Sequence, residues 1–129
     1  MTPVSQLLLS TTVAAAGMVR ARVDLTVLTP PAQGGVLLLR IRNGATGPTA
    51  QCIGRIMRAR KQSAMPAEGA EGTTGDGWIK VDEFGGGATA NAVTSWEYRF
   101  GPEAAYLQVE FTGHTGQAVG VDAVLHAYG

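Results

Sequence analysis

Hydrophobic and polar residues alternate with a period of two along most of this chain. The clearest runs cover residues 19–27, 105–112 and 117–128. Successive side chains of a β-strand point to opposite faces of a sheet, so these runs predict strands with one buried face and one wet face. The residues expected to face the core are Val19, Ala21, Val23, Leu25 and Val27, then Ala105, Leu107, Val109 and Phe111, and finally Val119, Val121, Ala123, Leu125 and Ala127.

Shorter apolar or alternating runs predict further strands at residues 5–10, 36–42, 50–60, 78–82 and 95–100. The run at 50–60 also fits helical spacing, but Gly54 inside it favours a strand with a bulge. Residues 36–39 are apolar at every position, which predicts that both faces of this strand are covered at that end. About eight strands at regular spacing, without a helical stripe, predict an all-β fold: an antiparallel β-sandwich or jelly roll.

The chain of 129 residues has the length of one ordinary domain, and it contains no repeat or linker that would divide it. We therefore expect a single domain over residues 1–129, with an extended N-terminal segment at 1–17. The Gly-rich stretch 62–77 predicts a long mobile surface loop, and loops of this length are often functional. Residues 113–116 join two alternating runs and are typical of a tight hairpin turn.

Charge is divided between the two halves of the chain, although the formal net charge is zero. Residues 1–61 contain eight basic side chains and one acid, whereas residues 62–129 contain nine acids and two basic side chains. Folding either interleaves the two halves through cross-strand ion pairs, or leaves a basic and an acidic face for neighbouring copies or partners. Only 16% of the residues are charged, which is typical of a surface that a partner covers in part.

A single cysteine, Cys52, excludes an intrachain disulfide and lies in an apolar run. We expect it to be a small buried residue of a protein that folds in a reducing cytoplasm.

The apolar run Leu7-Leu8-Leu9 is not preceded by Lys or Arg, and it is too short to span a bilayer. We therefore expect neither a secretory signal nor a membrane partner.

Side chains capable of catalysis or metal binding do not form a recognisable motif. His114 and His126 have no ligand-spaced histidine, cysteine or carboxylate beside them, as a zinc site requires. Asp122 and His126 lie on the same face of one predicted strand but about 13 Å apart, which argues against direct cooperation. The acids of the 62–77 loop match no calcium motif. We expect no catalytic residue, no metal and no cofactor, and we expect that the protein is not an enzyme.

The densest basic stretch, residues 55–61, could attract a phosphate backbone. However, the whole chain is neutral and no aromatic residue interleaves with the stretch, so we expect no nucleic acid partner. The aromatic residues of the second half could instead form a platform for a carbohydrate, although such residues are more often core or interface anchors. These residues are Trp78, Trp96, Tyr98 and Phe100.

Residues 105–119, Ala-Tyr-Leu-Gln-Val-Glu-Phe-Thr-Gly-His-Thr-Gly-Gln-Ala-Val, resemble the closing hairpin of small β-sandwich virion proteins of tailed bacteriophages. In that group a Thr-Gly-Asn-Thr-Gly-like turn precedes a valine-rich strand, and this chain has His114 in place of the asparagine. The run Ser95-Trp96-Glu97-Tyr98 resembles the same group. So does the leucine-rich opening strand followed by Val23-Asp24-Leu25.

This resemblance implies a virion structural protein, made in the host cytoplasm and located on the capsid surface. It implies a head decoration (cement) protein that binds the major capsid protein, stabilises the head and acts as a homo-oligomer, with a trimer favoured. The residues we expect at the partner interface are Arg55, Arg58, Arg60, Lys61, Leu7, Leu8 and Leu9. The alternatives are a tail or baseplate component with a carbohydrate- or receptor-binding role, and a small enzyme with a site in a deep pocket.

Overall fold

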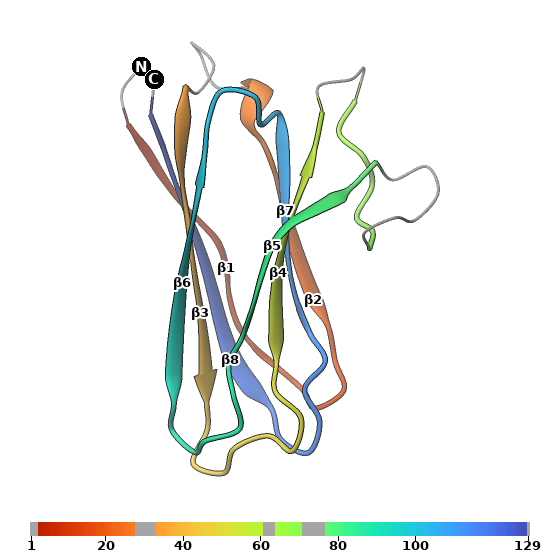
Figure 1. Ribbon diagram of the computed structural model, residues 1–129, viewed down its shortest axis with the longest axis vertical. Helices are drawn as coiled ribbons and strands as arrows, with labels where there is room; N and C mark the ends of the chain where they lie inside the picture. The colour runs from red at the N-terminus through yellow and green to blue at the C-terminus, as the bar shows by residue number, and fades with distance from the viewer. Residues whose placement is uncertain (1–2, 28–32, 61–63, 71–76, 129) are drawn as a thin grey trace.

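The computed structural model describes residues 3–27, 33–60, 64–70 and 77–128. Within them the chain forms eight β-strands and one three-residue 3₁₀ helix, and no longer helix (Figure 1). The elements are β1 (Val4–Val13), β2 (Val19–Asp24), η1 (Leu25–Val27), β3 (Gly34–Asn43), β4 (Ile53–Ala59), β5 (Ile79–Gly85), β6 (Val93–Phe100), β7 (Tyr106–Thr112) and β8 (Val119–Tyr128).

The strands form two antiparallel sheets that pack face to face (Figure 1). We call the sheet with the order β1-β8-β3-β6 sheet A and the sheet with the order β2-β7-β4-β5 sheet B. Only β4 and β5 are neighbours both in sequence and in a sheet, whereas every other connection crosses from one sheet to the other. This is the strand order of a jelly roll, so the predicted fold class is confirmed.

Core residues lie where the alternation places them. The inward positions of β7 and β8 are fully buried, and so are Val23 and Leu25. Four expected core residues differ: Val19 and Ala21 are half-buried, Ala105 belongs to a separate cluster around Trp78, and Val27 is 69% exposed. The strand ends at Asp24, whose carboxylate accepts a hydrogen bond from the Thr26 backbone N–H at 2.8 Å and turns the chain into η1. The alternation therefore stops before Val27.

The connection at residues 113–116 is not a hairpin turn, because β7 lies in sheet B and β8 in sheet A. It arches over the end of the sandwich and is held there by His114. This side chain is fully buried, and its Nε2 hydrogen-bonds the Val13 carbonyl at 3.0 Å. The His114 carbonyl accepts the Ala16 N–H at 2.8 Å. A hairpin turn and an arch between sheets are flanked by the same alternation of apolar and polar residues, so the sequence does not distinguish them.

The strand at 50–60 is confirmed as β4, and its helical alternative is wrong. Its pairing with β5 shifts register between Ile56 and Met57, beyond the expected position at Gly54. Gly54 has a different role, because a Cβ atom there would overlap the ring of Phe84. That ring stacks on Trp96 at a centroid distance of 5.6 Å and meets Phe111 edge-on at 6.5 Å. The glycine therefore makes room for an aromatic cluster between the sheets.

Opposite charges from the two halves of the chain interleave on folding. Arg20, Arg22, Arg40, Arg42, Arg55 and Arg58 each pair with an acid from the second half. The pairs form because strands of the first half alternate with strands of the second half within each sheet. The described chain is therefore not a particle with one basic and one acidic face.

Cys52 is completely buried, as expected, and burial raises the pKa of its thiol from 9.0 to about 11. The folded state holds this proton more tightly than the unfolded chain does. The thiol therefore stabilises the fold fully below pH 9, and this contribution is lost as the pH rises toward 11. Its size is about 2–3 kcal/mol.

Between pH 8.5 and 11 we expect the free energy of unfolding of the wild type to fall by about 2–3 kcal/mol more than that of the Cys52→Ala variant. Urea denaturation across this range measures the difference. Burial also raises the pKa of Tyr98, so both proteins share the alkaline loss from that residue and only the slope difference reports Cys52. Parallel slopes would show that the thiol does not titrate in the folded state as described.

Candidate functional site: the open face of sheet A

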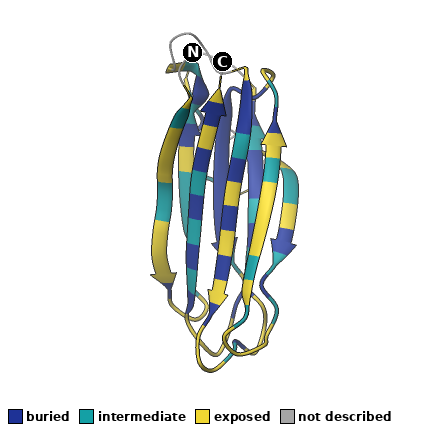
Figure 2. Cartoon of the chain, turned by 90° about the vertical axis from the view of Figure 1, so that its left-hand side faces the viewer, coloured by how far each residue is buried: buried dark blue, intermediate teal, exposed yellow. Residues whose placement is uncertain are grey.

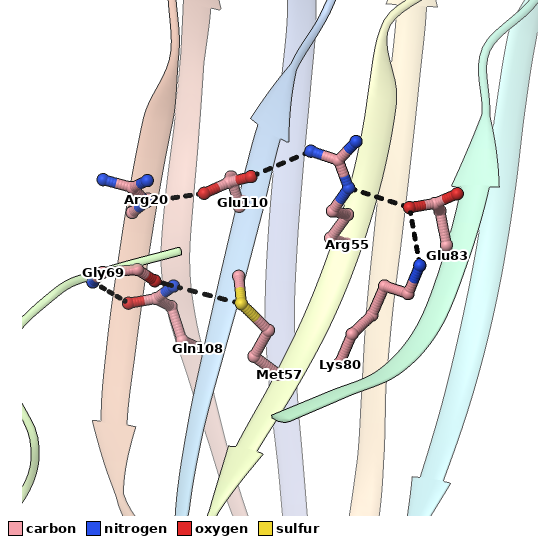
Figure 3. A network of polar contacts seen from close by, with 8 residues as sticks. All are labelled: Arg20, Arg55, Met57, Gly69, Lys80, Glu83, Gln108 and Glu110. Atoms are coloured by element: carbon pink, nitrogen blue, oxygen red, sulfur yellow. Dashed lines mark hydrogen bonds and ion pairs between the residues drawn. The ribbon is translucent and has the colours of Figure 1, made fainter. Parts of the chain in front are cut away.

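The two sheets differ in what covers their outer faces. Residues 64–70 lie across the outer face of sheet B. Trp78 forms a second small hydrophobic cluster there with Met57, Ala59, Ala105 and Tyr106, and Met65 of the segment packs against it. Gln108 exchanges two hydrogen bonds with the Gly69 backbone, at 2.6 and 3.2 Å (Figure 3). The Trp78 indole N–H donates to the Ala67 carbonyl at 2.8 Å. This part of the expected mobile loop is therefore docked. The rest of the loop lies outside the described residues.

Beside this cluster, charged side chains form a chain across the outer face of sheet B (Figure 3). The buried Glu110 carboxylate accepts hydrogen bonds from Arg20 Nε at 2.6 Å and from Arg55 Nη1 at 3.1 Å. Arg55 Nε also donates to Glu83 at 2.8 Å, and this hydrogen bond lowers the pKa of the Glu83 carboxyl. The basic and acidic groups of this network are therefore paired with one another.

Sheet A has no such cover among the described residues. Figure 2 looks onto its outer side, where buried and exposed residues alternate along the strands. We call this outer side the open face. Register places its residues in four rows from β1 through β8 and β3 to β6: Ser5–His126–Val36–Arg99, Leu7–Val124–Leu38–Glu97, Ser10–Asp122–Arg40–Ser95 and Thr12–Gly120–Arg42–Val93.

An apolar row crosses the middle of the open face. Leu7 is 63% exposed and Leu38 is 38% exposed, and Val124 lies between them in the register. Val93 and Tyr128, at the two ends of the face, are also large exposed hydrophobic residues. Half of the large exposed hydrophobic side chains of the described residues therefore lie on one sheet face. Apolar residues exposed on one face are a common feature of surfaces that bind other molecules.

Polar groups on either side of this row form two separate clusters. The Asp122 carboxylate accepts a hydrogen bond from the Ser10 hydroxyl at 2.7 Å and pairs with Arg42 at 3.2 Å and Arg40 at 3.8 Å. His126 Nδ1 lies 3.0 Å from the Ser5 hydroxyl oxygen. Because the two clusters have different partners, the structure does not bring Asp122 and His126 together as an acid–base pair.

A shallow groove of about 440 Å³ lies in the centre of the open face. Its lining combines the apolar Leu38 and Val124 with the charged Arg40, Glu97 and Asp122, and it also includes Trp96 and His126. The volume falls in the range of small-molecule sites. Among the described residues no group of three or more His, Cys, Asp or Glu side chains is arranged to hold a metal ion. Nor does the described part of the chain contain a helix long and apolar enough to cross a membrane.

The structure does not gather the expected basic stretch into one patch. Arg55 lies on the outer face of sheet B within the Glu110 network. Arg58 is the register partner of the buried Leu107, so its side chain leaves β4 on the face opposite to that of Arg55. It forms an ion pair with Glu103 at 3.6 Å. Arg60 is exposed just after β4, and Lys61 lies outside the described residues.

Of the three leucines expected at an interface, only Leu7 lies on the open face. Leu8 and Leu9 are half-buried and pack against the core, because the register shifts between Leu7 and Leu9. The strand that contains them is longer than expected and is already paired with β8, at one edge of sheet A.

The aromatic residues considered for a carbohydrate platform do not form one. Trp96, Tyr98 and Phe100 stand opposite Leu39, Leu37 and Gly35, on the inner side of sheet A. The Trp96 ring stacks on Phe84 from the other sheet, and its indole N–H donates to Asp82 at 2.8 Å. Trp78 is 2% exposed.

No protein-family model matches the chain, and no curated protein matches it in sequence. Solved structures do match its fold. The K1 and K3 cleaved adhesin domains of Lys-gingipain from Porphyromonas gingivalis W83 superpose with TM-scores of 0.59 and 0.58, at 8% and 10% identity. In both cases the match covers 93% of this chain and 74% of the other. The SPBc2 prophage-derived protein YomS matches more distantly, with a TM-score of 0.44, 12% identity, and coverage of 96% and 92%. At these identities the comparisons show that the chain shares a β-sandwich fold, and they carry no argument about function.

Proposed function

We propose that the protein is a non-catalytic structural component of a bacteriophage virion, a capsid decoration protein that binds the major capsid protein through its open face and stabilises the head. The observation that carries the proposal is the difference between the two outer faces. Residues 64–70 and an ion-pair network occupy the outer face of sheet B, whereas sheet A exposes an apolar row.

The sequence of β3 supports the same interpretation. Residues 36–39 are apolar at every position, a pattern typical of a strand that is covered on both sides. In the folded chain Leu37 and Leu39 are buried in the core, whereas Leu38 points to the open face and is exposed. A partner that docks on the open face would provide the missing cover. Repetition of this contact over a capsid lattice would multiply a modest affinity.

The test is co-sedimentation of the purified protein with expanded heads of the phage that encodes it, prepared from a mutant that lacks it. We expect saturable binding at a ratio fixed by the head lattice. The variant Leu7→Ser/Leu38→Ser should bind at least tenfold more weakly, because it removes about 3–4 kcal/mol of apolar contact at most. Both residues are exposed in the free chain, so its folding should be unaffected.

A matched control is Met18→Ser/Ile79→Ser, which replaces two exposed hydrophobic residues outside the open face. It should bind like the wild type. Charge reversal by Arg58→Glu/Arg60→Glu tests the basic stretch separately. If this variant loses attachment while Leu7→Ser/Leu38→Ser retains it, the interface lies on the basic stretch and not on the open face.

A second candidate function is a tail or baseplate component that binds a carbohydrate or another receptor. The groove on the open face favours it, because apolar and hydrogen-bonding side chains converge there. It ranks second because Trp96, the aromatic residue that lines the groove, stacks its ring on Phe84 of the other sheet. Absence of head binding, together with glycan binding that Asp122→Asn weakens, would favour this function over decoration.

A further inference from the structure

The four edge strands of the sandwich differ in how they are protected against pairing. An edge strand has neighbours on one side only, so half of its backbone N–H and C=O groups are available to another strand. The edges are β1 and β6 in sheet A and β2 and β5 in sheet B. Charged side chains, which oppose the pairing of edges, occur on three of them: Arg20, Arg22 and Asp24 on β2, Lys80, Asp82 and Glu83 on β5, and Glu97 and Arg99 on β6.

β1 has none of this protection. Its ten residues, Val-Ser-Gln-Leu-Leu-Leu-Ser-Thr-Thr-Val, include no charged residue and no proline. The side chains of Ser5, Gln6 and Leu7 are exposed. The irregularity between Leu7 and Leu9 bends the strand, and beyond it β1 runs toward β2 at the lower end of the sandwich (Figure 1). The accessible part of the edge is therefore its first half.

We propose that the first half of β1, Val4 to Leu9, pairs antiparallel with the same segment of a second copy of this chain and joins two A sheets into one continuous sheet. The lack of charge favours a second copy as the occupant. A segment with a net charge would repel its own copy, whereas Val4 to Leu9 has none and offers no ion pair to a charged partner strand.

The geometry of such a pair has a consequence for the open face. A two-fold axis perpendicular to the sheet leaves both outer faces on the same side. The rows Leu7–Val124–Leu38 of the two copies would then lie on the same side of the joined sheet, with their Leu7 ends toward the shared edge. The pair would present two open faces in one plane, and it would bind a lattice twice. This last consequence rests on the proposed function, whereas the pairing itself does not.

The pairing is tested in solution without phage heads, so its failure is separate from a failure of head binding. Sedimentation velocity over a wide range of protein concentration should show the mass rising from the 13.4 kDa of one chain toward twice that value. Gln6→Lys places a charge on the paired segment and should reduce the association at least tenfold. Ser95→Lys makes the same change on the other edge of sheet A and should leave it unchanged, while thermal unfolding confirms that both variants fold.

Single-cysteine variants locate the contact, because the buried Cys52 cannot compete for oxidation. We expect Cys introduced singly at Ser5, Gln6 or Leu7 to give a disulfide-linked dimer that forms fastest at the position nearest the two-fold axis. Cys at Ser95 should give none. A monomer at every concentration, a stable trimer, or equal cross-linking on β1 and β6 would each overturn the proposal. If the wild type is a monomer and the Gln6→Lys variant loses head binding, the edge pairs instead with a strand of the capsid partner.

Discussion

Replacing Trp78 with alanine is expected to lower the free energy of unfolding by about 3–5 kcal/mol. The Trp78 side chain is 2% exposed and packs with Met57, Ala59, Tyr106 and Met65 on the outer face of sheet B. Truncation removes the largest member of this cluster and leaves a cavity beneath residues 64–70. It also leaves the Ala67 carbonyl without its indole donor. Urea denaturation followed by circular dichroism measures the change.

A second measurement distinguishes a local effect from a general loss of stability. The Gly69 N–H donates to Gln108 at 3.2 Å, so its hydrogen exchange reports whether the segment is docked. In Trp78→Ala this amide should exchange faster under native conditions than the amides of β8 do.

Trp96→Ala is the matched control, because it also removes an indole but lies 40% exposed beside Phe84, away from the 64–70 segment. It should leave the exchange of Gly69 unchanged relative to β8. A loss of less than 1 kcal/mol in Trp78→Ala, with Gly69 still protected, would show that the segment is held by other contacts.

Fold class was predictable because a period of two is a local property of each strand. Val119, Val121, Ala123, Leu125 and Ala127 face the core as the alternation requires. Strand pairing was not predictable in the same way, since alternation says which residues share a face but not which sheet a strand joins. The arch at residues 113–116 illustrates this limit. It resembles a hairpin turn in sequence, yet it connects the two sheets.

Alternation predicts that the outward-facing residues of sheet B are solvated, so it does not predict the cover over this sheet. Tyr106, Gln108 and Glu110 do alternate with the core residues of β7, but all three are buried. The 64–70 segment resembles an ordinary loop in sequence. Part of its contact with sheet B comes from backbone groups, as in the two hydrogen bonds between Gly69 and Gln108, and a pattern of side chains does not reveal such contacts. One available signal was the presence of large Tyr and Gln side chains at successive outward positions.

The open face was partly visible in the sequence, and the basic stretch was not a guide to it. Apolar residues at 36–39 indicated a covered outer side on β3, and the structure places Leu38 there. In contrast, Arg55 and Arg58 are three residues apart on a strand, which puts them on opposite faces. Neighbouring charges in sequence therefore formed no common surface.

Replacing Glu110 with leucine is expected to lower the free energy of unfolding by about 2–4 kcal/mol. Its carboxylate is buried between two guanidinium groups, from Arg20 on β2 and Arg55 on β4, so its loss leaves both without their shared acceptor (Figure 3). Arg55 keeps Glu83 as a partner, whereas Glu110 is the only acid paired with Arg20 among the described residues. The larger part of the loss should therefore come from Arg20.

That division is tested with a double-mutant cycle. Adding Arg20→Met to Glu110→Leu removes the unpaired charge and fills the site with apolar groups, so the double variant should be more stable than Glu110→Leu alone. We expect a coupling energy of about 1–3 kcal/mol between the two residues from denaturation curves. Glu97→Leu is the control, because its partner Arg99 lies on the exposed side of β6, and it should cost less than about 1 kcal/mol. If Glu97→Leu costs as much as Glu110→Leu, the burial of the Glu110 carboxylate is not what makes its ion pairs strong.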